Sequence, residues 1–104
     1  MLSGIIGLGL VAAAASIPCP RVTRSDALRM ARAIGINWSR VAFRPEQLRK
    51  GIAVELEHGP CGPGGRATDV THGVLVVSAR IAYAHLLERA DYYELLERYV
   101  EPRS

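Results

Sequence analysis

Apolar residues recur three or four positions apart through most of the chain beyond residue 20, and no stretch of useful length alternates apolar and polar residues. The first spacing places side chains on one face of an α-helix, whereas alternation would indicate a half-buried strand. The pattern therefore predicts no strand and four short helices, at about residues 24–36, 45–58, 74–89 and 91–101. The side chains expected to face the core are, in chain order, Leu28, Ala31 and Ile34, then Leu48, Ile52 and Leu56, then Leu75, Ala79, Ala82 and Leu86, and finally Tyr92, Leu95 and Tyr99.

Residues that start and stop helices flank these segments. Either Thr23 or Ser25 is placed to cap the first helix, and Gly35 is placed to end it. Pro45 fits the first turn of the second helix, and the Gly-Pro pair at 59–60 ends it. The glycine-rich stretch that follows lacks the Gly-Lys-Ser/Thr ending of a phosphate-binding loop, so we expect an ordinary loop there.

The last helix and the first connector complete the predicted architecture. Asp91 and Glu94 have the spacing of a capping box, with aspartate in the usual Ser/Thr role. Trp38, Val41 and Phe43 lie in the connector between the first two helices and are expected to plug the core. The predicted fold class is all-α, a compact bundle of three to four short helices with an apolar N-terminal arm or helix.

The first 18 residues are uncharged apart from the terminal amine, and residues 2–17 form an apolar run. As a helix this run would be about 24 Å long, short of the roughly 30 Å hydrocarbon core of a bilayer. A secretory signal requires a basic residue before its apolar run, and no Lys or Arg precedes the run here. The stretch "AAAAS" could nevertheless supply a cleavage site. A secretory signal, a short membrane anchor and an arm that docks onto a partner subunit stay open. We favour the arm and divide the chain into an N-terminal segment, residues 1–20, and a small helical domain, residues 21–104.

The net charge of +3 is unevenly distributed, with +4 over residues 21–58 and −1 over residues 59–104. The basic excess is almost all arginine, which forms bidentate contacts with carboxylate or phosphate. A charge of this size is typical of a solvated helical face or of salt bridges to a partner, and we expect no specific nucleic acid. The predicted partner-binding residues are Leu2, Ile5, Ile6, Leu8, Leu10 and Val11 of the arm, with Arg21, Arg24, Arg29 and Arg32.

The chain has two cysteines, Cys19 and Cys61, each beside a proline. Two cysteines are too few for a disulfide framework or a zinc site. Two free thiols, in a cytosolic or virion protein, are the favoured interpretation, and a bridge formed in an oxidising compartment is the alternative.

Two Glu/His pairs are the candidates for chemistry. Glu55 and His58 are three residues apart, and His85 and Glu88 repeat that spacing in the third predicted helix. Helices that each bring such a pair inward build di-metal carboxylate bundles, but the other two helices here supply no clearly inward carboxylates. At most, Glu55, His58, His85 and Glu88 would bind one divalent transition metal. The favoured interpretation is simpler: Glu55 and His85 form a hydrogen-bonded pair that joins two helices, and His58 closes a helix end.

Three motifs resemble those of a family of small uncharacterised proteins that occurs in bacteria and is common in phage genomes. They are Glu-Leu-Glu-His-Gly at residues 55–59, Ala-His-Leu at 84–86 and Asp-Tyr-Tyr at 91–93. The likeness covers about residues 25–99 and leaves out the N-terminal apolar block. It implies a helical fold and a frequent phage context, and it implies no reaction.

The chain departs from the family pattern at three places. His72-Gly73-Val74 stands where the family has an acidic turn with proline, which weakens any cation site built on that turn. Arg80 replaces a lysine, and Ala90 replaces the proline before Asp-Tyr-Tyr.

These observations predict a non-enzymatic structural or interaction protein without a catalytic residue or a cofactor. Its most concrete form is a minor virion component of a phage, a minor capsid or cement subunit that docks onto capsid subunits or another larger assembly. The alternatives are a small helical domain that binds one divalent transition metal, and an accessory protein anchored in the bacterial inner membrane through residues 2–17 or located in the cytoplasm.

Overall fold

The computed structural model describes residues 17–100. Residues 1–16 lie outside this range, and with them the predicted arm residues Leu2, Ile5, Ile6, Leu8, Leu10 and Val11. No helix in the described part of the chain is both long enough and apolar enough to cross a membrane.

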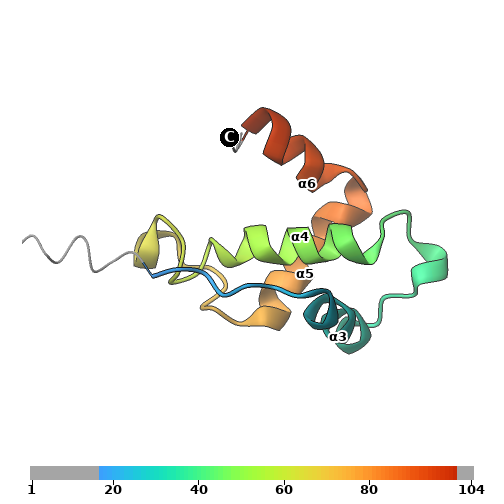
Figure 1. Ribbon diagram of the computed structural model, residues 1–104, viewed down its shortest axis with the longest axis horizontal. Helices are drawn as coiled ribbons and strands as arrows, with labels where there is room; N and C mark the ends of the chain where they lie inside the picture. Colours follow the sequence, from blue (N-terminus) through green and yellow to red (C-terminus); the bar gives the residue numbers. More distant parts are fainter. Residues whose placement is uncertain (1–16, 101–104) are drawn as a thin grey trace, which may run out of the picture.

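The predicted all-α fold is confirmed, because residues 17–100 form helices and turns and contain no strand. Helix α4 (Pro45–Leu56) runs through the centre, and α3 (Arg24–Ile34) and α5 (Leu75–Glu88) pack against it (Figure 1). Helix α6 (Tyr92–Leu95) continues directly into the π-helix η3 (Leu96–Val100), which projects from the body. The elements in chain order are α3 (Arg24–Ile34), η1 (Trp38–Arg40), α4 (Pro45–Leu56), η2 (Gly65–Thr68), α5 (Leu75–Glu88), α6 (Tyr92–Leu95) and η3 (Leu96–Val100).

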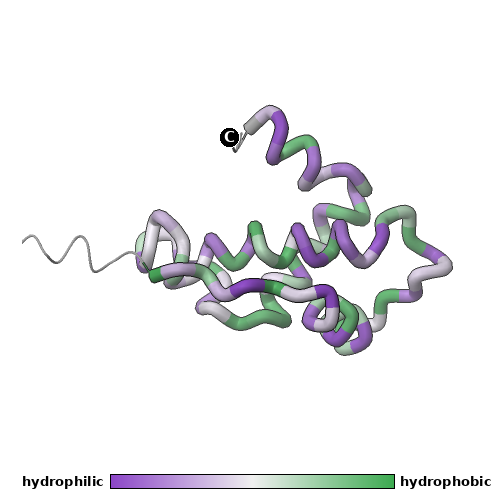
Figure 2. Tube along the Cα trace, in the orientation of Figure 1, coloured by the Kyte–Doolittle hydropathy of each residue, from purple (hydrophilic) through white to green (hydrophobic). Residues whose placement is uncertain are grey.

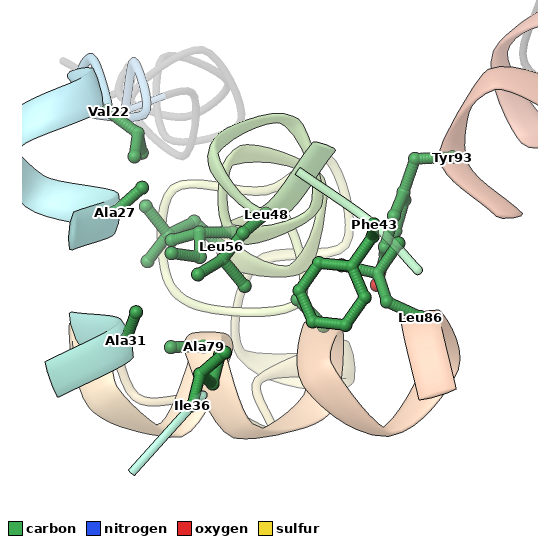
Figure 3. Packing of buried hydrophobic residues seen from close by; sticks show 12 residues of the cluster. Val22, Ala27, Ala31, Ile36, Phe43, Leu48, Leu56, Ala79, Leu86 and Tyr93 are labelled. Atoms are coloured by element: carbon green, nitrogen blue, oxygen red, sulfur yellow. The ribbon is translucent and has the colours of Figure 1, made fainter. Parts of the chain in front are cut away.

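The core lies between α3, α4 and α5 (Figure 3). The predicted inward face of α4 is confirmed, since Leu48, Ile52 and Leu56 are almost fully buried. On α5, Ala79, Ala82 and Leu86 are buried as predicted, and Leu75 is partly buried against them. The whole cluster consists of Val22, Ala27, Ala31, Ile36, Phe43, Leu48, Ile52, Leu56, Ala79, Ala82, Leu86 and Tyr93.

The buried face of α3 is rotated from the predicted one. Ala27 and Ala31 are fully buried, whereas Leu28 is only half-buried, and Ile34 packs partly against the core. Two alanines one turn apart present a flat surface, which lets the helix pack closely against its neighbours. The prediction that Leu28 lies at the centre of the buried face is therefore wrong. Hydrophobicity alone does not show which side of α3 packs closely against the neighbouring helices.

A capping box starts α3, which settles the choice between Thr23 and Ser25. The Thr23 hydroxyl accepts a hydrogen bond from the Asp26 N–H at 3.0 Å, and the Asp26 carboxylate accepts one from the Thr23 N–H at 2.9 Å. Gly35 ends the helix with φ at +80°, the left-handed conformation that glycine adopts without strain. Both ends of this helix were therefore readable from local sequence.

The capping box predicts an acid-dependent loss of stability at the start of α3. The Thr23 N–H and then the Arg29 guanidinium, at 2.7 Å, lower the pKa of Asp26 from 3.8 to about 2. Because the folded-state pKa is the lower one, this contribution is complete above the unfolded pKa and is lost as pH falls from about 4 towards about 2. An NMR titration should show the Asp26 carboxyl and the Thr23 amide shifting together near pH 2. An Asp26→Asn variant should lack this transition, and a midpoint near 4 would contradict the prediction.

The connector residues behave as predicted. Phe43 is fully buried, and its ring meets Trp38 and Tyr83 edge-on, with ring centroids 5.7 Å and 5.9 Å apart. Trp38 and Val41 are partly buried against the core. Pro45 begins α4 as expected. The Gln47 side chain accepts a hydrogen bond at 2.7 Å from the backbone N–H of Arg44, the residue that precedes the helix.

The prediction for the fourth helix is wrong in two respects. Asp91 forms no cap, because its carboxylate accepts a hydrogen bond from Arg89 at 2.6 Å. The buried residue is Tyr93, and Tyr99 is 70% exposed. The helix widens into a π-helix at Leu96, which moves Tyr99 off the face that an α-helical period predicts. Tyr93 precedes this change and is buried because its ring lies against Gly51 of α4, while Tyr92 is only partly buried.

The favoured interpretation of free thiols is also wrong, since Cys19 and Cys61 form a disulfide with their Cα atoms 4.8 Å apart. The two cysteines are 42 positions apart in sequence but become neighbours when residues 17–23 lie beside α4 (Figure 1). Arg49 holds this segment in place through a 3.3 Å hydrogen bond from its Nη1 to the Val22 carbonyl. The pairing depends on a tertiary contact that cysteine counting cannot detect.

Candidate functional site

The candidate site lies where helices α4, α5 and α6 approach one another closely. Gly51 is buried where the three helices meet. A Cβ atom at this position would lie 2.6 Å from Tyr93 Cε2 and 2.9 Å from Ala82 Cβ. The lack of a side chain at Gly51 therefore lets the Tyr93 ring lie against α4. Glu55 follows one turn later on the same face of the helix, within reach of the Tyr93 hydroxyl.

Glu55 is a buried carboxylate, and Tyr93 is its hydrogen-bond partner. Glu55 is 6% exposed, and Tyr93 is 1% exposed. The Tyr93 hydroxyl donates a hydrogen bond to Glu55 Oε2 at 2.6 Å. Burial, followed by this hydrogen bond to Glu55, raises the pKa of the Tyr93 hydroxyl far above its ordinary value, so Tyr93 stays a neutral donor. A buried carboxylate without such a donor would be costly, which makes this contact part of the fold.

His85 completes the cluster from α5. Its Nε2 lies 3.7 Å from Glu55 Oε2, and its side chain is 33% exposed. The imidazole stacks on the Tyr92 ring, with centroids 4.3 Å apart and planes 4° from parallel, and it meets Tyr93 edge-on. The predicted hydrogen bond between Glu55 and His85 is therefore not formed: the two side chains are neighbours across α4 and α5, but the hydrogen bond to Glu55 comes from Tyr93. Tyr93 was not singled out as a site residue, because its role depends on where α6 crosses α4.

The structure does not bring the four predicted metal ligands together. Glu55 and His85 are neighbours, but α4 ends at Leu56, so His58 lies beyond the helical face that the three-residue spacing assumed. His58 and Glu88 are both exposed. Over residues 17–100, no group of three or more His, Cys, Asp or Glu side chains is placed to hold a metal ion. Only Glu55 and His85 of the four predicted ligands are neighbours, and Glu55 already accepts a hydrogen bond from Tyr93.

A groove of about 190 Å³, lined in part by Tyr93, lies between α4 and α6–η3. Lys50 on its rim lies 3.7 Å from Glu94 and 3.5 Å from Glu97. These charges therefore compensate one another within the molecule. The residues that line the groove are Arg49, Lys50, Ala53, Val54, Glu57, Tyr93, Leu96 and Glu97.

The second candidate surface is the outer face of α3. All four predicted partner-binding arginines, Arg21, Arg24, Arg29 and Arg32, are exposed. Arg29 forms an ion pair with Asp26 at 2.7 Å, whereas Arg21 and Arg32 have no ion-pair partner within residues 17–100. Each turn of this helix contains both hydrophilic and hydrophobic positions (Figure 2), as expected of a helix with one face in the core and the other in solvent.

Comparison with known families assigns most of the chain. The sequence profile of a family described as "Protein of unknown function (DUF5661)" matches residues 27–101. The chain belongs to the DUF5661 family. This confirms the expected membership of an uncharacterised family. Comparison with curated proteins and with solved structures gave no match. Within the DUF5661 domain lie all residues of the Glu55 cluster, whereas Cys19 and Arg21 precede it.

Proposed function

We propose that this DUF5661 protein is a non-enzymatic interaction protein that binds an acidic surface of a larger assembly through the outer face of α3. The observation that carries the proposal is the arrangement of Arg24 and Arg32, both exposed and two helical turns apart, with the half-buried Leu28 between them. Arg32 has no ion-pair partner among the described residues. Guanidinium groups at this spacing suit carboxylates on a partner, which they can bind in bidentate fashion.

Arginine contacts alone would give the complex selectivity and little affinity. Exposed ion pairs contribute about 0.2–1 kcal/mol each, and complementary charge mainly speeds association and excludes wrong partners. Apolar burial must supply the rest of the binding free energy. We assign this role to the N-terminal arm, whose apolar residues precede Ile17 in the sequence.

We further propose that the assembly is a phage virion and that this chain is a minor capsid-associated subunit. The motif resemblance to a family common in phage genomes supports this version. The Cys19–Cys61 disulfide is compatible with it, because virion surfaces are among the oxidising environments in which disulfides persist.

Incorporation into purified particles tests the proposal. A double variant, Arg24→Glu with Arg32→Glu, should lower incorporation at least about tenfold, equivalent to roughly 1.4 kcal/mol of binding free energy. The matched control reverses two exposed arginines elsewhere, Arg66→Glu with Arg80→Glu, and should incorporate normally.

Removal of residues 1–18 should abolish incorporation and leave the circular dichroism of the helical body unchanged, since Cys19 and all described helices are retained. Normal incorporation of the α3 variant would refute the arginine interface. Absence of the wild-type protein from purified particles would refute the virion version.

A further inference from the structure

The disulfide joins the domain that contains nearly all of the core to an N-terminal stretch that contributes only Val22 to it. Cys61 lies inside the DUF5661 match, which begins at residue 27, whereas Cys19 precedes it. Of the twelve residues in the described core, Val22 alone comes before residue 27. The covalent link therefore ties an N-terminal extension to a domain that builds nearly all of its core without it.

Little else holds the extension upstream of Val22. Val22 itself is 3% exposed, and its carbonyl accepts the hydrogen bond from Arg49. Residues 17–21 form no helix, and within the described chain the disulfide at Cys19 is the only cross-link or ion pair that joins their side chains to the domain. Ile17 is 54% exposed. Opening the disulfide would thus leave this stretch restrained at Val22 and by one weak contact, since the Cys19 Sγ lies 4.0 Å from the Leu56 carbonyl oxygen.

The loop on the other side of the bridge keeps its shape by other contacts. The His58 carbonyl accepts a hydrogen bond from the Thr71 N–H at 3.2 Å, and the Gly62 N–H donates to the Gly59 carbonyl at 3.1 Å. A Cβ atom at Gly62 would overlap the backbone of Glu57, so the turn packs tightly against the end of α4. Reduction at Cys61 would leave these contacts in place.

We propose that the Cys19–Cys61 disulfide is a reversible redox latch that holds residues 17–22 against the end of α4. Both cysteines are half-buried and neither is enclosed in the core, as attack by a small thiol of the glutathione class requires. The thiolate of the reductant attacks one sulfur and releases the other cysteine as a thiolate. A second thiolate then resolves the mixed disulfide, so that two electrons and two protons convert the bridge to two thiols and the reductant to its own disulfide.

Opening the latch releases the extension and leaves the helices packed. The latch goes beyond the proposed function, because it sets when residues 17–22 are held on the domain and when they are released. Its release can be measured on the isolated protein, so its failure is distinguishable from failure of the docking proposal.

Limited trypsin digestion of the full chain, with and without reduced glutathione, tests the latch. The exposed Arg21 provides a cleavage site beside the anchored Val22, and the exposed Arg40 in η1 provides an internal reference. Reduction should speed cleavage after Arg21 about tenfold or more, because cleavage follows the population of the open form, and should leave cleavage after Arg40 unchanged. A Cys19→Ser/Cys61→Ser variant should be cleaved rapidly in either condition.

Two further readouts make the test decisive. Thiol titration should find no free thiol before reduction and two after it, and the helical circular dichroism signal should be the same in both states. Equal cleavage rates after Arg21 in the two states would overturn the latch. A loss of helical signal on reduction would also overturn it, since the bridge would then be a structural staple of the whole domain.

Discussion

Replacement of Tyr93 by alanine is expected to lower the free energy of unfolding by about 3–5 kcal/mol, the range for truncating a large buried aromatic side chain. Tyr93 is 1% exposed and packs where α4, α5 and α6 meet. Its loss would leave a cavity, and it would also remove the hydrogen-bond donor of the buried Glu55. Urea denaturation followed by circular dichroism measures the change, provided that the slope with denaturant stays constant.

Two further variants divide this effect into packing and hydrogen bonding. Tyr93→Phe keeps the ring and removes only the hydroxyl, so it should cost about 1–3 kcal/mol, the penalty for leaving a buried polar group unsatisfied. Tyr99→Ala is the matched control, because Tyr99 lies in the same C-terminal segment but is 70% exposed, and its change should stay within about 0.5 kcal/mol. If Tyr93→Phe is as stable as wild type, the hydrogen bond to Glu55 contributes nothing to stability.

Replacement of Gly51 by valine should destabilise the protein by about 3 kcal/mol, the upper part of the range for overpacking a core. The Cβ atom alone would come within 2.6 Å of Tyr93 Cε2 and 2.9 Å of Ala82 Cβ, distances that real Cβ atoms do not adopt. The two methyl groups of valine would add to this crowding. Relief requires α6 or α5 to move away from α4, which would also stretch the contact between Tyr93 and Glu55.

A valine at an exposed helical position separates crowding from helix propensity. Ala84 lies on the exposed side of α5, and Ala84→Val should cost no more than about 0.7 kcal/mol, the intrinsic preference for alanine in a helix. Gly51→Ala should fall between the two valine variants, because the gain in helix propensity offsets part of the clash. Stabilisation by Gly51→Val would show that the three helices can separate at this point without loss.

Local sequence was sufficient to predict the ends of helices that are fixed by hydrogen bonds and backbone angles of neighbouring residues. The ends of α3 at Thr23 and Gly35 and the start of α4 at Pro45 follow from hydrogen bonds and backbone angles within a few positions. The buried faces of α4 and α5 follow from the three- and four-residue spacing of their core residues, although Glu55 and Ser78 are also buried and Leu87 is exposed. The same local logic failed for α3 and α6. On α3, Ala27 and Ala31 face the core in place of Leu28, and on α6, Tyr93 is buried because its ring lies against Gly51.

By itself, the sequence determined that the protein is helical, where its main helices lie and that Glu55 and His85 would border the core, since these properties depend on contacts between residues three or four positions apart. Only the tertiary structure decided that Tyr93 binds Glu55, that His58 and Glu88 stay apart from them, and that Cys19 pairs with Cys61. Each of these outcomes joins or separates residues on different elements. Such contacts depend on the distances and angles at which the helices pack, and a close approach such as that at Gly51 becomes visible only when the neighbouring helices are in place.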